Sequence, residues 1–217
     1  MKAIIFDKDG VLIETFDSYL QAYTKVLSKI GIKIKGNDIA KRYGIKGPEI
    51  IKQIAAENGK NITDEQAKEL ANEKDKLYLK FSEKKLKLLP GVKKLLIYLK
   101  KKKYKIGIAS SASRETIEQM IRVTKIKNYI NACVDGFEVK SSKPDPEIFL
   151  KCAKKLNVNP KDCVVVEDSV HGIEAAKRAG MKSLAVTTGQ TSRKDLESLN
   201  PNWVLDSLED FRKIGEI

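Results

Sequence analysis

Two aspartates near the N-terminus stand where a buried strand is expected to end. The apolar run "KAIIF" at residues 2–6 is followed by Asp7, Lys8, Asp9 and Gly10. If the strand geometry persists, Asp7 and Asp9 point to one side and Lys8 to the other. Paired carboxylates in such a place can hold a divalent cation, or divide into a nucleophile and a proton-transfer group. The alternative is a pair of solvated loop aspartates.

Three later stretches place further polar side chains close to apolar runs. The stretch "IGIASSAS" brings Ser110 and its neighbour Ser111 to a strand end, where hydroxyl and backbone N–H groups can donate to a phosphate oxygen. Lys143 lies in "SSKPDPEIF", which prolines stiffen, and a fixed ammonium suits a phosphoryl group or a carboxylate. Glu167 and Asp168 end the run "CVVVED", and two carboxylates there need a cation or hydrogen bonds to offset their burial. Taken singly, the serine stretch could be a plain strand-to-helix turn, and Lys143 could be one more surface lysine.

The apolar runs that precede these groups are typical of a parallel sheet. They lack polar alternation, which indicates strands covered on both faces, and helical patterns separate them, as in a doubly wound α/β fold. The polar groups then share the carboxyl edge of one sheet, an arrangement that suits Mg²⁺ and a phosphoryl group. The predicted strands span 2–6, 104–110, 163–167, 183–188 and 203–205, the last with Trp203, and the predicted helices span 91–102, 113–124, 145–156 and 170–179.

Local signals predict several helix ends. Ser113 precedes its helix as a possible N-cap, and Asp145 is the expected N-cap of the next helix, with Pro146 at its first position. Gly180 follows residues 170–179 and is typical of the position just past a helix end.

The connection after the first strand is much longer than one crossover helix requires. Residues 15–86 show no strand signal, whereas Thr63 and Gln66 form a capping box at a helix start. We expect 15–86 to be an all-helical cap domain, inserted into a Rossmann-like core of residues 1–14 and 87–217. At the carboxyl end of the first strand, the insertion is placed to act as a lid. The apolar residues on one helical face are Leu20, Tyr23, Leu27 and Ile30.

Composition places limits on the function. The chain has 217 residues, 41% hydrophobic and 33% charged, with a formal charge of +13. Nucleic-acid binding is one interpretation of that charge, but the lysines flank amphipathic helices and no aromatic–basic motif accompanies them. A lysine-rich solvated surface is favoured, and it could also steer anionic substrates.

Cysteine spacing and the absence of a leader-like segment limit the class further. Cys133, Cys152 and Cys163 are widely spaced, which predicts buried small residues rather than a zinc site or a disulfide framework. No signal peptide or long apolar run is evident. We therefore expect a cytoplasmic protein that does not bind membranes, present as a monomer or weak homodimer.

The four stretches resemble a known family. In order, "FDKDGVL", "IASS", "SSKPDP" and "VVVEDSVHGIEAAKRAGM" are similar to the four motifs of the haloacid dehalogenase superfamily. The "PGV" segment and the helical insertion match as well, so the resemblance covers essentially the whole chain. The chain is most similar to the helical-cap branch that includes phosphoglycolate phosphatases and β-phosphoglucomutases.

This resemblance implies roles for the candidate residues. Asp7 corresponds to the nucleophile that forms an aspartyl-phosphate, and Asp9 to the general acid/base, whose backbone carbonyl also binds Mg²⁺. Ser110, with Ser111, and Lys143 would hold the transferring phosphoryl group. The Mg²⁺ site implied by the family consists of Asp7, Asp9, Glu167 and Asp168.

The implied function is a Mg²⁺-dependent phosphatase that acts on a small phosphate monoester. The alternative is β-phosphoglucomutase-like phosphoryl transfer on a sugar phosphate. Close mutases carry a histidine and an arginine where this chain has Tyr19 and Gly47, which favours the phosphatase. Members that cleave carbon–halogen bonds lack the second aspartate, which is present here as Asp9.

Two non-enzyme classes remain as alternatives. Phospho-receiver domains also combine an acidic pair with a lysine, but they are shorter and lack a large helical insertion. A nucleic-acid-binding role would rest on the charge of +13 alone, so we expect no specific nucleic-acid partner.

Four other polar residues, inside or outside the four motifs, have expected places as well. We expect Lys8 to form a salt bridge behind the site or to contact the cap, and the single histidine, His171, to be an ordinary helix-start or surface residue. Arg42 and Lys46 either meet a substrate anion or, as we favour, belong to a solvated helix face.

Overall fold

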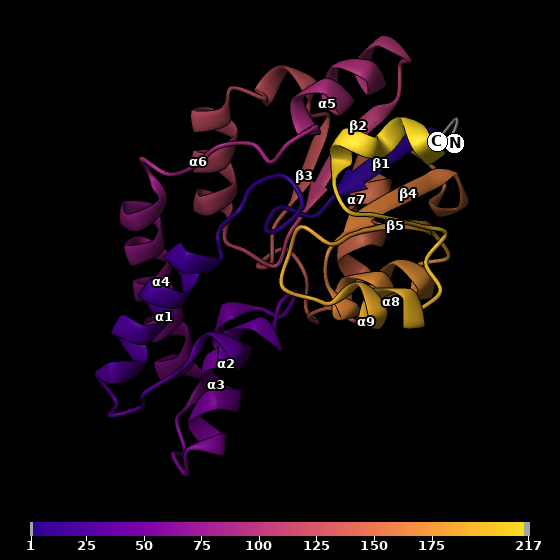
Figure 1. The fold of residues 1–217 in the computed structure, drawn as a ribbon. Coiled ribbons are helices and arrows are strands. Elements are labelled where there is room, and N and C mark those ends of the chain that lie inside the picture. The colour runs from indigo at the N-terminus through magenta and orange to yellow at the C-terminus, as the bar shows by residue number, and fades with distance from the viewer. Residues whose placement is uncertain (1, 215–217) are drawn as a thin grey trace.

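The core of the protein is a six-stranded parallel sheet with the strand order β3-β2-β1-β4-β5-β6. A computed structural model describes residues 2–214, and Figure 1 shows the sheet with helices on both sides. The central position of β1 explains why its four residues are all buried. The strands are β1 (Ala3–Phe6), β2 (Lys105–Ala109), β3 (Ala132–Val134), β4 (Cys163–Glu167), β5 (Lys182–Val186) and β6 (Trp203–Leu205).

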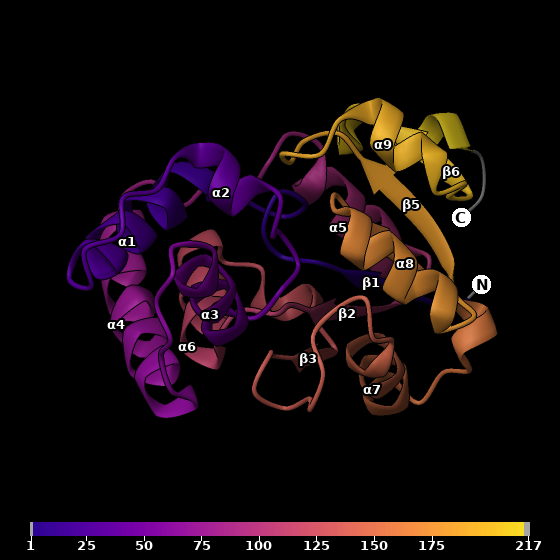
Figure 2. The same ribbon diagram turned by 90° about the horizontal axis from the view of Figure 1, so that it is seen from below.

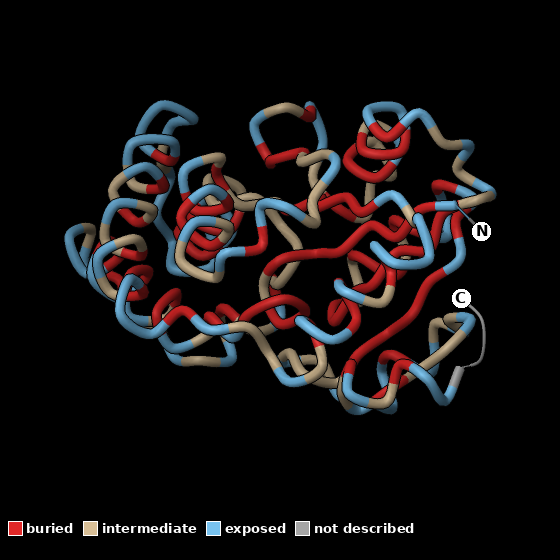
Figure 3. The backbone as a smooth tube through the Cα atoms, turned by 90° about the horizontal axis from the view of Figure 1, so that it is seen from above, coloured by how far each residue is buried: buried red, intermediate tan, exposed pale blue. Residues whose placement is uncertain are grey.

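Alternating side chains build one apolar layer on each face of the sheet. Ile4 and Phe6 join the cluster that packs against α5 and α6, whereas Ala3 and Ile5 join the cluster that packs against α7 and α8. Figure 3 shows these strands as a continuous buried layer. The doubly wound α/β fold expected from the sequence is therefore confirmed. The helices of this part are α5 (Val92–Lys101), α6 (Arg114–Thr124), α7 (Glu147–Leu156), α8 (Val170–Arg178), α9 (Arg193–Ser198) and the short 3-10 helices η1 (Lys127–Tyr129), η2 (Pro160–Asp162) and η3 (Leu208–Ile214).

Three local predictions differ from the structure. Strand β3 has no counterpart among the predicted strands. Helix α7 begins at Glu147 with Pro146 at the N-cap position, although the Asp145 carboxylate still accepts a hydrogen bond from the Glu147 N–H at 2.9 Å. Ser113 is the N-cap residue of α6, but its hydroxyl makes no capping hydrogen bond. In contrast, Gly180 follows α8 with a φ of 68°, as predicted.

Four helices lie between β1 and α5 and have an apolar core of their own. Buried residues of this core include Tyr23, Leu27, Ile51 and Tyr78. Figure 2 shows these helices gathered to one side of the sheet. The Thr63–Gln66 capping box is present at the start of the longest of them. The helices are α1 (Phe16–Ser28), α2 (Gly36–Ala40), α3 (Gly47–Glu57) and α4 (Asp64–Ser82).

The chain leaves and rejoins the sheet through two segments that lie side by side. Ile13 forms isolated bridges with Asp9 and, in antiparallel orientation, with Leu88. The Leu89 N–H donates to the Leu12 carbonyl at 2.9 Å. The four helices α1 to α4 and their connections form the helical segment, and its two ends are therefore tied to each other at the edge of the sheet.

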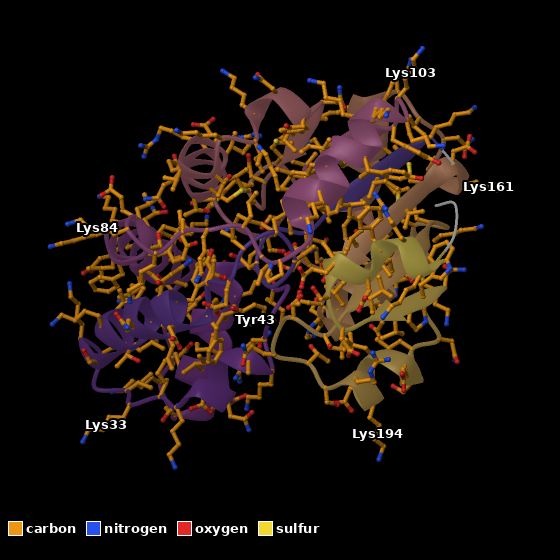
Figure 4. All side chains as sticks on the ribbon, turned by 45° about the horizontal axis from the view of Figure 1, so that its top comes forward. Lys33, Tyr43, Lys84, Lys103, Lys161 and Lys194 are labelled. Carbon is orange, nitrogen blue, oxygen red and sulfur yellow. The ribbon has the colours of Figure 1, made fainter. Side chains whose placement is uncertain are left out.

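Many lysines and two of the three cysteines follow the composition-based expectations, whereas Lys8, Lys74 and Lys143 are buried. Lys33, Lys84, Lys103, Lys161 and Lys194 are exposed and project from the periphery in Figure 4. Cys133, Cys152 and Cys163 are free thiols, the last two buried. Within residues 2–214, none of the helices combines the length and apolar character that crossing a bilayer would require.

Candidate active site

Side chains from the carboxyl ends of β1 and β4 meet the lysine of the loop before α7. The Nζ atom of Lys143 lies 2.6 Å from Asp7 Oδ1 and 2.5 Å from Glu167 Oε1. All three side chains are buried. Burial alone would lower the pKa of Lys143, but the two carboxylates raise the pKa above its ordinary value. The sequence-predicted residues Asp7, Lys143 and Glu167 are thus brought together as one charged cluster.

The Asp7 carboxyl group lies in an environment rich in negative charge. Burial raises the pKa of Asp7 from 3.8 to about 7; Lys143 opposes this shift, while Glu167 and Asp9 add to it. The Oδ2 atom of Asp7 accepts a hydrogen bond from the Asp9 N–H at 3.0 Å. The carboxyl group is therefore fixed by contacts to both oxygens.

The Glu167 carboxylate is bound from both ends. While Oε1 contacts Lys143, Oε2 accepts hydrogen bonds from the Asp168 N–H, the Ser169 N–H and the Ser169 hydroxyl at 2.9–3.1 Å. Gly172 makes room for this carboxylate, because a Cβ at that position would lie 1.9 Å from its carboxyl carbon. Glu167 therefore fixes both Lys143 and the first turn of α8.

The Asp168 side chain is buried and lies in a recess formed by two glycines. A Cβ on Gly10 would lie 2.2 Å from Asp168 Oδ2, and a Cβ on Gly189 would lie 1.6 Å from the same atom. This oxygen has no hydrogen-bond partner among the described residues. The pKa of Asp168 is raised well above its ordinary value, mainly by burial and further by the negative charges of Glu167 and Asp7. An unpaired buried carboxylate oxygen is costly and requires a counter-charge.

These observations fit a hard divalent cation at the acidic cluster. Lys143 contacts the carboxylates of Asp7 and Glu167, and Lys8 contacts that of Asp9, whereas Asp168 has no such ion pair in the described part of the chain. The orphaned Oδ2 of Asp168 is a hard oxygen donor of the kind that Mg²⁺ prefers. Within residues 2–214, no three His, Cys, Asp or Glu side chains already converge as a metal cluster.

The serine segment after β2 lines the site in two different ways. The Ser110 hydroxyl is buried and accepts a hydrogen bond from the Ala112 N–H at 3.3 Å. The Ser111 hydroxyl instead donates to the Gly44 carbonyl at 2.6 Å, across to the segment between α2 and α3. Both serines line the same pocket as Asp7, as the sequence predicts, but the Ser111 side chain also links the helical segment to the core.

The pocket in front of Asp7 is small and lies between the core and the helical segment. Its volume is about 60 Å³. The core supplies its acidic and serine wall, whereas α1, α2, α3 and the segment between α2 and α3 supply mainly aromatic and aliphatic side chains, and α4 supplies Lys74. The residues of this wall are Tyr19, Tyr23, Ile39, Arg42, Tyr43, Gly44, Ile45, Gly47, Ile50 and Lys74, opposite Asp7, Asp9, Ser110, Ser111, Ala112, Asp168 and Ser169.

Lys8 does not point away from the paired aspartates. Strand β1 ends at Phe6, so strand alternation does not extend to residues 7–9. The Lys8 Nζ lies 2.6 Å from Asp9 Oδ1 and contacts the rings of Tyr19 and Tyr78 in α1 and α4. Burial alone would lower the pKa of Lys8, but Asp9 raises the pKa above its ordinary value. A salt bridge and a contact with the helical segment are both present, as expected for Lys8, but its ammonium lies against Asp9 instead of pointing to the opposite side.

A loop of the helical segment is hydrogen-bonded to the core beside the pocket. Lys46 Nζ donates to the carbonyls of Val139 and Lys140, each at 2.9 Å. The Lys46 N–H donates to the Ser142 hydroxyl at 3.2 Å, and this hydroxyl donates to Glu49 at 2.7 Å. Figure 4 places Tyr43 between the helical segment and the core. The structure therefore shows the helical segment closed over the pocket.

Two expectations about basic residues were wrong, and a third needs refinement. Arg42 lines the pocket and is buried, with bonds to Gln53, the Asp38 carbonyl and Glu57, so it does not belong to a solvated face. Lys46 contacts core carbonyls, as described above. His171 is in α8 as expected, but its Nδ1 lies 3.0 Å from the Tyr43 carbonyl and so forms another contact to the helical segment.

The motif-based prediction missed Gly189 and Thr188. They lie after β5, where Gly189 makes room for Asp168 and the Thr188 hydroxyl donates to the Gly10 carbonyl at 2.5 Å. The only sequence signal is the "TTG" at the end of a predicted strand, which identifies a carboxyl-edge loop but no contact.

Comparisons with known proteins agree with this geometry. A family model for haloacid dehalogenase-like hydrolases matches residues 4–186. A β-phosphoglucomutase of Bacillus subtilis is 35% identical, over 94% of this chain and 96% of its own. A phosphorylated carbohydrates phosphatase of Thermotoga maritima is 38% identical, over 85% and 84% of the two chains.

Solved structures show the same similarity. A β-phosphoglucomutase crystal structure from Clostridium difficile superimposes with a TM-score of 0.87 at 32% identity, covering 97% of this chain and 92% of that one. Because both the family model and these relatives span most of the sequence, the chain belongs to the haloacid dehalogenase-like hydrolases.

Proposed function

We propose that the protein is a Mg²⁺-dependent phosphatase that hydrolyses a small phosphate monoester through an aspartyl-phosphate on Asp7. The observation that carries this proposal is the buried contact of Lys143 with Asp7, a residue that lines the pocket. A carboxylate fixed beside an ammonium and a serine hydroxyl is suited to attack and hold a phosphoryl group. The relatives named as phosphatases support the same reaction class.

In the first step, Asp7 attacks phosphorus while Asp9 acts as a general acid. A bond forms between an Asp7 carboxylate oxygen and phosphorus, and the bond between phosphorus and the ester oxygen breaks. Its electron pair stays on the ester oxygen, which takes a proton from Asp9 and leaves as an alcohol. Lys143 and Ser110 hold the phosphoryl oxygens during this transfer.

In the second step, water releases the phosphoryl group from Asp7. Asp9, now a carboxylate, takes a proton from water as the water oxygen attacks phosphorus. The phosphorus–oxygen bond to Asp7 breaks and its electron pair returns to the carboxylate. The products are inorganic phosphate and regenerated Asp7, with the proton again on Asp9.

Asp7, Asp168 and the backbone carbonyl of Asp9 would hold Mg²⁺, with Glu167 completing the acidic set. When bound, the cation neutralises charge on the phosphoryl oxygens and on the crowded carboxylates. Support comes from the unpaired Oδ2 of Asp168 and from the raised pKa values of Asp7 and Asp168. Both oxygens of Glu167 already accept hydrogen bonds, one of them from Lys143. Glu167 therefore also supports the site by holding Lys143 in place.

Residues 15–86 form, in this proposal, a cap domain on a core of residues 1–14 and 87–217. Its separate apolar cluster and its hydrogen bonds beside the pocket support a lid that excludes water during phosphoryl transfer. The proposal also includes a cytoplasmic protein that is a monomer or weak homodimer without a specific nucleic-acid partner. Light scattering during size-exclusion chromatography and binding titrations with RNA and DNA at low salt test these points.

The relatives point to phosphorylated carbohydrates or polyols as the substrate class. The phosphatase of Thermotoga maritima is named for phosphorylated carbohydrates and that of Escherichia coli for hexitols. Similarity to β-phosphoglucomutases keeps phosphoryl transfer on a sugar phosphate as the second candidate. Tyr19 and Gly47, which replace the histidine and arginine of close mutases, both line the pocket and favour hydrolysis.

A panel of small phosphate esters with Mg²⁺ tests the proposed function. We expect release of inorganic phosphate from at least one sugar or polyol phosphate, with the ester oxygen retained in the alcohol. Conversion of a sugar phosphate into its isomer without phosphate release would establish the mutase instead. Stable phosphorylation of the protein without turnover would favour a phospho-receiver.

A further inference from the structure

Lys8 is a fully buried ammonium in contact with one of the two proposed reacting carboxylates. Its Nζ lies 2.6 Å from Asp9 Oδ1, and its side chain has no exposed surface. We propose that Lys8 is a positioning residue that holds the Asp9 carboxylate at the pocket wall when the helical segment is closed. This inference rests on the phosphatase proposed above, in which Asp9 transfers the proton.

The surroundings of Lys8 come from two separate parts of the chain. Lys8 and Asp9 belong to the loop after β1, whereas Tyr19 and Tyr78 belong to α1 and α4. The two rings are stacked with centroids 4.2 Å apart, and Lys8 Nζ lies 5.4 and 5.1 Å from those centroids. Both distances allow cation–π attraction, so closure of the helical segment brings the tyrosine rings against the ammonium.

Stability alone is a poor explanation for this lysine. Buried ion pairs often contribute little net stability, because desolvation offsets the attraction between the charges. An apolar side chain at this position would pack well against the two stacked rings. The contact with Asp9 therefore explains the charge of Lys8 better than packing does.

Lys74 provides an internal comparison. It is also buried, and its Nζ lies 5.0 Å from the Tyr19 ring centroid and 5.2 Å from that of Tyr23. Its ion-pair partner is Asp75, the next residue in the same helix. The Lys8 pair instead anchors Asp9, which faces the pocket.

The contact engages one Asp9 oxygen and leaves the other for proton transfer. Lys8 holds Oδ1, whereas the contact of Oδ2 with the described residues is a long one, 3.4 Å from the Tyr19 hydroxyl. Loss of this anchor lets the carboxyl group rotate, and small misplacements of a proton donor slow the reaction strongly. The reaction is slowed for those substrates whose leaving oxygen needs a proton. Acetyl phosphate does not, because acetate leaves with the electron pair of the broken bond and stays an anion.

The test compares kcat/KM for the best alkyl phosphate of the panel with kcat/KM for acetyl phosphate, since this ratio reports the first phosphoryl transfer. For Lys8→Met we expect a loss of about tenfold or more with the alkyl phosphate. With acetyl phosphate we expect a change of less than about threefold, because that transfer does not use the Asp9 proton. Lys8→Gln, which keeps a hydrogen-bond donor, should lose less with the alkyl phosphate.

Two further variants separate the possible outcomes. Lys46→Met removes a contact to the core that does not touch Asp9, so it should lower kcat/KM by the same factor for both substrates. Asp9→Asn should lose about a hundredfold or more with the alkyl phosphate while largely retaining acetyl phosphate. If Asp9→Asn shows no such selectivity, the proton role in the proposed function fails.

In one outcome, Asp9→Asn loses kcat/KM mainly with the alkyl phosphate while both Lys8 variants lose no more with the alkyl phosphate than with acetyl phosphate. That result overturns the positioning role of Lys8 and leaves the proposed phosphatase function intact. Equal loss on both substrates, or loss of folding in both Lys8 variants, would likewise assign Lys8 a structural role and reject the proposal.

Discussion

The Nζ atom of Lys143 lies 2.6 Å from Oδ1 of Asp7, and both side chains are buried. The two residues are far apart in the sequence, one after the first strand and one before α7. In the proposed reaction, the phosphoryl group arrives at this pair, so Lys143 contacts the nucleophile before it contacts the substrate. The pair is therefore the part of the site on which the first prediction depends.

Replacing Asp7 with asparagine should reduce phosphate release to background, because the amide cannot form the aspartyl-phosphate. Lys143 and Ser110 remain, so inorganic phosphate or vanadate should still bind, which isothermal titration calorimetry can measure. Turnover retained in a pure Asp7→Asn preparation would reject the nucleophile assignment.

Removal of divalent cations should abolish activity, and added Mg²⁺ should restore it. The physical reason is the unpaired Asp168 Oδ2 among four carboxylates, for which the cation supplies the missing charge. Mg²⁺ should also raise the unfolding temperature of the wild type, and Asp168→Asn should lose this increase. Full activity in EDTA would contradict the metal assignment.

The stability of the metal-free protein should fall as pH rises from acidic to neutral. The pKa of Asp7 is raised from 3.8 to about 7, so between these values the native state binds more protons than the unfolded state. The free energy of unfolding then decreases with pH. Urea titrations in EDTA should give a shallower decrease for Asp7→Asn. Asp168, whose pKa is also raised, keeps part of the slope in that variant. Identical pH slopes for both proteins would argue against a raised pKa at Asp7.

Gly189→Ala should weaken Mg²⁺ binding and lower activity strongly. The new methyl group would stand 1.6 Å from Asp168 Oδ2, so the carboxylate must move. Gly36→Ala is the matched control, because its methyl group would meet only the Phe16 and Leu20 side chains at 3.4–3.8 Å. The comparison uses the Mg²⁺ concentration at half-maximal activity. Equal values for the two variants would show that the Gly189 recess is dispensable.

The sequence predicts the sheet well because its central strands are continuous apolar runs. The acidic pairs, Ser110 and Lys143 follow from the same logic, since strand ends of a parallel sheet share one edge. Strand β3 was missed because its sequence "ACV" has one β-branched residue and no aromatic residue, whereas the equally short β6, "WVL", has both. Such a run carries little periodicity to distinguish it from a loop.

The remaining errors concern contacts between distant segments. Lys8 was misplaced because the strand ends one residue before Asp7, after which alternation no longer governs direction. Arg42 looks like a surface cation in the sequence, yet its partners Gln53 and Glu57 lie on the following helix. The role of Gly189 depends on a carboxylate twenty-one positions away, at Asp168. Local patterns contain none of this information.

The contact between Leu12 and Leu89 has a consequence for how this architecture can change over evolution. The two connecting segments are hydrogen-bonded to each other. For the core, the intervening helices are therefore equivalent to a single loop with closely spaced ends. The entropy of closing such a loop grows only slowly with its length. Helical inserts of different sizes can therefore be exchanged at this junction without shifting the register of the sheet.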